Sequence, residues 1–165
     1  SRESEDRLQI SLIDISRAYF NARTSDEYPV YVELPPEDPD YGSDLCGRLN
    51  VHMYGTRPAA DGWHWGCSQI LKDMGFRVGQ SSACLFWHKE RNLRSSVHGD
   101  DFTFSGQGGD LESIRDLMRE WFEIKVRGAL GPDPGDDKEI VILGRTVRVG
   151  DFGYEYEAVV IVGLS

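Results

Sequence analysis

Two stretches decide the fold of this chain, LIDISRAYF at residues 12–20 and VHGDDFTF at residues 97–104. In each stretch an apolar, strand-like run leads to carboxylates: Asp14 in the first, Asp100 and Asp101 in the second. Strands usually deplete aspartate, because its side chain competes for backbone hydrogen bonds. Carboxylates that converge at strand ends repel one another unless a cation lies between them, and such hard oxygen ligands suit Mg²⁺. The pattern therefore predicts an acidic, cation-binding site at strand ends.

The second stretch also predicts a tight hairpin. Residues 93–97 and 102–104 are strand-like, so Gly99 and Asp100 can form its two-residue loop. A type II′ turn needs a positive φ at its first central residue, which glycine adopts without steric cost. Such a turn would present Asp100 toward Asp14.

The rest of the chain predicts further strands and two helices. Residues 8–12 alternate with period two and continue as a strand that ends at Asp14, and residues 28–34 alternate again before Pro35 and Pro36. Residues 37–44 are predicted to be an exposed loop. Further strands are predicted at residues 85–87, 140–143, 146–149 and 154–156.

Apolar residues at helical spacing predict one helix over residues 59–74, with Asp61 as its N-cap and Gly75 as a left-handed C-cap. A second helix follows Asp110, its predicted cap, with an apolar stripe from Leu111 to Phe122. The glycines at 106–109 fit a strand–helix loop better than a phosphate-binding loop. Strands without regular βα alternation predict an α+β fold, an antiparallel sheet with helices on one face.

The composition is that of an ordinary globular domain, with 165 residues, 39% hydrophobic and 28% charged. No apolar run reaches the roughly 18 residues of a membrane span, and no signal segment is recognisable, so an intracellular, non-secreted protein is expected. Three cysteines make a disulfide framework improbable. A zinc site from His64, Cys67, Cys84 and His88 is the alternative to cysteines that act as small buried hydrophobic residues.

The net charge of −10 opposes binding to a phosphate backbone. Any grip on a nucleic acid would therefore depend on parts outside this chain. The acidic residues 133–137 hint at a calcium loop but lack its spacing, which favours a solvated linker.

Several blocks, in order, resemble the copia-type LTR-retrotransposon reverse transcriptases. The 12–20 stretch and the Asp-Asp pair resemble the catalytic motifs of their palm. PVYVELPP (29–36) resembles "YMEQP", and MYGTRPA (53–59) through Trp63 resembles "LYGLKQAPRxW". GF (75–76) with ACLF (83–86) resembles "GF…D.CLY", and FEIK (122–125) with LGR (143–145) resembles "FEMKDLG…FLGI". The resemblance implies a palm domain over residues 8–156, with irregular or truncated ends at 1–7 and 157–165.

The resemblance implies an RNA-directed DNA polymerase in which two Mg²⁺ ions, replaceable by Mn²⁺, clamp an in-line phosphoryl displacement. Asp14 and Asp100 would then ligate both ions. The Ile15 carbonyl could add a ligand, and Asp101 would be a supporting charge.

The resemblance also implies residues that contact the nucleotide. Tyr19 would pack beneath the incoming sugar and exclude a 2′-OH, with a core aromatic as the alternative. Arg57 would lie near phosphate, and Gly99 near the primer end. Lys125 would protonate pyrophosphate, unless it is a solvated strand-edge lysine.

The chain departs from the family's pattern in several places, among them Arg57, where the family has Lys, and the apolar tail at 158–165. His98-Gly99 replaces Tyr-Val, and Pro58, Ala60 and Asp61 replace Gln, Pro and Arg.

The expected partners are an RNA or DNA template with its primer, dNTPs and the rest of a retroelement polyprotein, which would supply fingers, thumb and RNase H. The expected location is the cytoplasm or a retroelement particle. One alternative function is an inactive retroelement relic that keeps the palm fold. Another is a metal-dependent phosphodiesterase, which the four scattered histidines do not favour.

Overall fold

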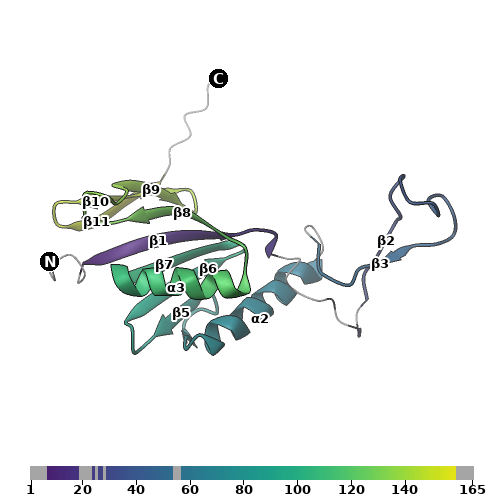
Figure 1. Ribbon diagram of the computed structural model, residues 1–165, viewed down its shortest axis with the longest axis horizontal. Helices are drawn as coiled ribbons and strands as arrows, with labels where there is room; N and C mark the ends of the chain where they lie inside the picture. Colours follow the sequence, from purple (N-terminus) through teal and green to yellow (C-terminus); the bar gives the residue numbers. More distant parts are fainter. Residues whose placement is uncertain (1–6, 19–23, 25, 28, 54–56, 159–165) are drawn as a thin grey trace, which may run out of the picture.

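We analysed a computed structural model of the chain, which describes residues 7–18, 24, 26–27, 29–53 and 57–158. Its strands and helices follow one another along the sequence as shown in Figure 1. They are β1 (Leu8–Ile15), β2 (Tyr31–Val32), β3 (Gly47–Arg48), α2 (Arg57–Asp73), β4 (Arg77–Val78), β5 (Leu85–His88), β6 (Leu93–His98), β7 (Asp101–Gln107), α3 (Gly108–Trp121), β8 (Ile124–Leu130), β9 (Glu139–Ile142), β10 (Arg145–Gly150) and β11 (Gly153–Ala158).

The main body is a six-stranded sheet with the order β4-β5-β6-β7-β1-β8. Neighbouring strands in it are antiparallel, and β1 lies between β7 and β8. This sheet with two helices agrees with the predicted α+β class. No helix in the described part of the chain combines the length and apolarity needed to span a membrane.

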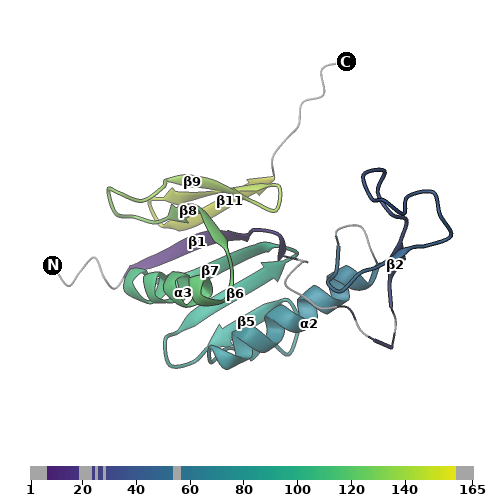
Figure 2. The same cartoon turned by 45° about the vertical axis from the view of Figure 1, so that its right-hand side comes forward.

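Both helices cover the same face of this sheet (Figures 1 and 2). Alternate residues of the strands point into this core, because successive strand side chains face opposite sides. The buried cluster joins β1, β5, β6 and β7 to α2 and α3 through Ile13, Ile15, Phe86, Leu93, Val97, Phe102, Phe104, Trp63, Cys67, Leu71, Leu111, Ile114 and Met118. The core is rich in aromatic rings, and Phe102 and Phe104 are stacked with centroids 6.1 Å apart.

Helix α2 ends as predicted at a left-handed glycine. Gly75 has φ of 94°, and its N–H bonds to the Lys72 carbonyl, while the N–H of Phe76 bonds to the Leu71 carbonyl. This is the Schellman arrangement. The predicted helix starts were wrong. Helix α2 begins at Arg57, so Asp61 is not its cap, because proline at position 58 is compatible with a first turn. The N-cap of α3 is Gln107, whose side chain makes no capping hydrogen bond, rather than Asp110.

The opposite face of the main sheet is partly covered by a second sheet of order β11-β10-β9, seen above β1 and β8 in Figure 1. A third, two-stranded sheet pairs β2 with β3 and lies apart from the main body (Figures 1 and 2). The strand predicted over residues 28–34 is thus confined to Tyr31–Val32. Residues 37–44 are mostly exposed, as predicted.

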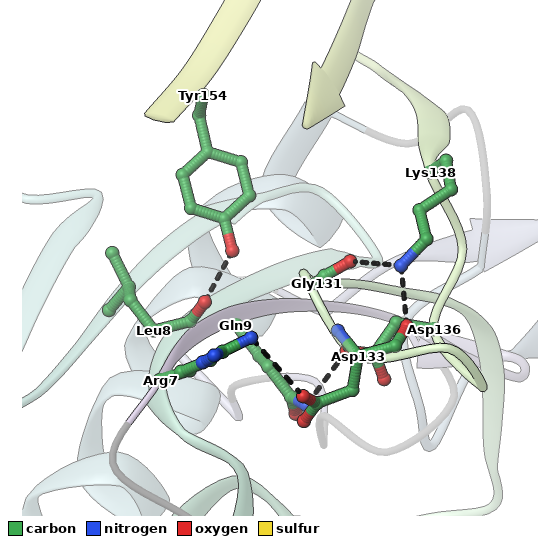
Figure 3. A network of polar contacts seen from close by, with 8 residues as sticks. All are labelled: Arg7, Leu8, Gln9, Gly131, Asp133, Asp136, Lys138 and Tyr154. Carbon is green, nitrogen blue, oxygen red and sulfur yellow. Dashed lines mark hydrogen bonds and ion pairs between the residues drawn. The ribbon is translucent and has the colours of Figure 1, made fainter. Parts of the chain in front are cut away.

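The acidic segment 133–137 is not a free linker (Figure 3). The Asp136 carboxylate accepts bonds from Gln9 Nε2 and from the Asp133 N–H, each at 3.0 Å. Lys138 Nζ donates to the carbonyls of Gly131 and Asp133, and the Tyr154 hydroxyl donates to the Leu8 carbonyl. These bonds tie the loop and β11 to the start of β1. The prediction of a solvated linker was wrong, because it neglected partners distant in sequence.

Candidate active site

The Asp-Asp pair lies at the tip of the β6–β7 hairpin. His98 pairs with Asp101, so Gly99 and Asp100 form a two-residue loop. Gly99 has φ of 60°, whereas Asp100 is not among the residues with positive φ. A positive φ at the first central position alone matches a type II′ turn. The predicted turn is therefore confirmed.

Helix α2 holds this turn from the core side. The indole Nε1–H of Trp63 donates to the Gly99 carbonyl at 2.6 Å. The Trp63 ring is only 3% exposed and makes edge contacts with Phe102 and Phe122, at centroid distances of 6.4 and 5.5 Å. The sequence placed Trp63 on an apolar helix stripe but did not reveal this bond, because nothing local indicates which carbonyl its N–H would meet.

Strand β1 brings Asp14 to the same corner. Asp14 is the cross-strand partner of Asp101 on β7, so the two side chains leave the same face of the sheet. The N–H of Ile15 donates to the Asp100 carbonyl at 3.0 Å, which fixes the end of β1 against the turn. The two acidic stretches, far apart in sequence, therefore meet, with Asp101 as the direct neighbour of Asp14 and Asp100 in the adjoining turn.

Strand β8 contributes two cations on the other side of Asp14. Lys125 is the cross-strand partner of Asp14. Arg127 donates from Nε and Nη2 to Oδ2 of Asp14, at 3.0 and 2.5 Å. Sequence reasoning missed Arg127, because 113 residues separate it from Asp14 and no local pattern marks the contact.

The carboxylates influence one another. Burial raises the pKa of the Asp101 carboxyl above its ordinary value of 3.8, and the negative charges of Asp100 and Asp14 raise it further, while Arg127 and His98 lower it. Hydrogen bonding to Asp14 raises the pKa of the Arg127 guanidinium. The corner thus carries unfavourable negative charge that Arg127 partly neutralises.

The donor set fits a hard divalent cation, since aspartate oxygens gathered at one corner are the ligands that Mg²⁺ takes. In the described residues, no three His, Cys, Asp or Glu side chains are arranged closely enough to hold a metal as they stand. Asp14 instead uses Oδ2 to bind Arg127. The chemistry of these oxygens therefore fits the predicted cation, and Asp14 is the acid that is also held by Arg127.

A pocket of about 350 Å³ opens beside the acids on the face away from the helices. His98, Asp101 and Thr103 of the main sheet line it, together with Arg127 of β8. Residues of β9, among them Ile140 and Ile142, form its other wall. The site is thus an open cleft between two sheets.

Two of the predicted nucleotide contacts cannot be placed. Tyr19 lies outside the described residues. Arg57 is the first residue of α2, but its side chain is also outside them.

The cysteines fit the earlier expectation only in part. Cys67 is buried, and burial raises the pKa of its thiol to about 11, as expected of an inert core thiol. Cys84 is exposed, so its predicted burial was wrong, because it precedes rather than enters the core-facing part of β5. Over the described ranges, no zinc-like grouping of His64, Cys67, Cys84 and His88 is found.

Comparison with known protein families shows to which family the chain belongs. A family model described as "Reverse transcriptase (RNA-dependent DNA polymerase)" matches residues 3–132, more than half of the 165 residues. No curated protein matches the chain. The matched range includes both acidic stretches and β8, and it confirms the resemblance seen in the sequence blocks.

Proposed function

Because this chain belongs to the reverse transcriptase family, we propose that it is the palm of a copia-type polymerase that adds dNTPs to a primer 3′-OH. The observation that carries this proposal is the pairing of Asp14 with Asp101, with Asp100 in the adjoining turn. The carboxylates of Asp14 and Asp101, from two distant stretches, leave the same face of the sheet, and Asp100 adjoins them in the turn. A purely structural role would not require such mutually repelling groups.

In this proposal Asp14 and Asp100 hold two Mg²⁺ ions, with the Ile15 carbonyl as a further ligand and Asp101 as a supporting charge. When bound, the ions neutralise charge on the transferring phosphoryl group and orient its attacking and leaving oxygens. The chain's own contribution is positioning. The Ile15–Asp100 and Trp63–Gly99 bonds fix the backbone on which the acids stand.

Lys125 is the proposed proton donor to the leaving pyrophosphate. Its position across from Asp14 supports this role, because both side chains leave the same face of the sheet. Tyr19 and Arg57 are proposed to contact the sugar and the phosphates of the nucleotide, and Gly99 to lie near the primer end.

The proposed partners are dNTPs and an RNA or DNA template with its primer. The net charge of −10 requires that much of the template grip come from other parts of a retroelement polyprotein. Such a protein would work in the cytoplasm or in a retroelement particle. Its two ions would be Mg²⁺, for which Mn²⁺ could substitute.

Primer extension with dTTP on poly(rA)/oligo(dT) tests the proposal, with the 165-residue chain and with its reading frame extended upstream. We expect Mg²⁺-dependent extension that Asp14→Asn lowers by roughly 100-fold or more. Asp116→Asn is the matched control, because this acid lies on the exposed side of α3 and pairs with Arg119. Extension that Asp14→Asn leaves unchanged would overturn the assignment.

A second readout needs no activity. Mn²⁺ should raise the melting temperature of the chain and of Asp116→Asn but not of Asp14→Asn. A protein that neither extends primers nor responds to Mn²⁺ would instead be the inactive relic.

A further inference from the structure

Arg127 is the extra residue of a β-bulge in β8. Val126 pairs with Ile13 and Gly128 pairs with Leu12, so the register shifts by one residue and Arg127 has no partner on β1. A bulge re-aims the side chain of its extra residue. Alternation already puts Lys125 and Arg127 on the face of the sheet that carries Asp14. The bulge takes Arg127 out of register with Leu12, and its guanidinium reaches Asp14.

The guanidinium takes up one carboxylate oxygen of Asp14 with two donors. Both Nε and Nη2 of Arg127 bond to Oδ2, the side chain of Asp14 is 16% exposed, and that of Arg127 is 53% exposed. Charge-assisted bonds of this kind are stronger than neutral ones. The contact therefore lowers the availability of Asp14 to any other cation.

We infer that Arg127 is a built-in counter-ion that competes with a divalent cation for Asp14. This inference rests on the proposed function, in which Asp14 is a metal ligand. A guanidinium on Oδ2 occupies one of the two carboxylate oxygens and adds a positive charge beside the site, so a divalent cation binds Asp14 more tightly once Arg127 has moved away. The apparent metal affinity is then reduced by the fraction of molecules in which Arg127 is bound.

The surroundings of Arg127 allow this exchange. Its side chain is half-exposed, and Arg127 lines the 350 Å³ pocket together with the acidic residues Asp137 and Glu139. A displaced guanidinium thus has both space and negative charge to move toward. Partial exposure also keeps the pair weak enough to open, because solvent screens half-exposed ion pairs.

Mn²⁺ titration followed by water-proton relaxation tests the inference on the 165-residue chain. Arg127→Leu should bind Mn²⁺ about five- to tenfold more tightly than the parent protein, since it loses a competitor of modest strength. The matched control is Arg119→Leu, which removes the same charge from an exposed pair with Asp116 on α3. It should change the midpoint by less than about twofold.

Arg127→Gln is a second variant, for use if leucine disturbs β8, because glutamine stays polar but carries no charge. It should also bind Mn²⁺ more tightly than the parent protein. Equal or weaker Mn²⁺ binding by folded Arg127 variants, with the parent protein still binding at Asp14, would overturn the competition alone. Mn²⁺ binding that Asp14→Asn does not affect would overturn both the competition and the proposed metal site.

Discussion

The two faces of the six-stranded sheet are built by alternate residues of the same strands, yet they have opposite properties. On β7, Phe102 and Phe104 are fully buried against the helices, whereas Asp101 and Thr103 face the cleft. The core face gains stability from buried apolar area. The cleft face gathers carboxylates, and burial together with their mutual repulsion raises the pKa of Asp101. Stability and the candidate chemistry are thus separated by a one-residue step along a strand.

The largest expected difference between the two faces is the loss of unfolding free energy on truncating two neighbouring residues of β7. Phe104→Ala should lower the free energy of unfolding by about 3–5 kcal/mol, because it leaves a cavity in a closely packed aromatic cluster. Thr103→Ala should change it by less than about 0.5 kcal/mol, since it alters only the cleft face. Urea denaturation measures both, and similar losses would show that the two faces do not differ as described.

Gly99→Val tests the turn that carries the acids. Valine at a φ of 60° is strained, so we expect a loss of about 1–3 kcal/mol and weaker binding of Mn²⁺ as Asp100 is displaced. Gly135→Val is the matched control, because that loop glycine has an ordinary φ and open space around it. Equal melting temperatures for the two variants would contradict the importance of the turn conformation.

Trp63→Phe sharpens the comparison, because this core residue supports the acidic face. Phenylalanine keeps an aromatic ring but cannot donate to the Gly99 carbonyl. We expect a loss of about 1–2 kcal/mol from the missing bond and the smaller ring. A Mn²⁺ midpoint that shifts while the core remains folded, judged by near-UV circular dichroism, would indicate a positioning role; an unchanged midpoint would restrict Trp63 to packing.

Asp101→Asn should give the smallest effect, with the opposite sign. The folded pKa of Asp101 is raised above 3.8, so its ionisation opposes folding as the pH rises above that value. The variant should therefore be more stable than the parent at neutral pH, by up to about 1 kcal/mol, since solvent screens a half-exposed group. The difference should disappear below pH 3.8, and thermal melts between pH 3 and 7 would reveal a wrong sign.

The sequence predicted best what depends on local patterns. The alternation of apolar residues predicted the strand that carries Asp14. The glycines predicted the II′ turn at Gly99 and the end of α2 at Gly75. The helix starts were predicted wrongly, because aspartate is a favoured N-cap residue and this preference indicated Asp61 and Asp110 as the caps. The helices begin earlier, at Arg57 before Pro58 and after the extended Gln107. The Arg127 bulge could not be predicted, since a register shift depends on the pairing of strands more than 100 residues apart. The same reason hid the Asp136 and Lys138 bonds.

The place of β1 in the sheet has a consequence for the time course of synthesis. This strand is synthesised before the other described strands, and both of its neighbours, β7 and β8, begin more than 80 residues later. Because translation adds roughly 5–20 residues per second, the backbone N–H and C=O groups of β1 remain without their strand partners for on the order of ten seconds. Contacts between such distant segments also slow folding. Nascent chains that contain β1 but not yet β8 are therefore expected to need chaperones, whereas α2 and the β5–β6–β7 hairpins can form as soon as they are made.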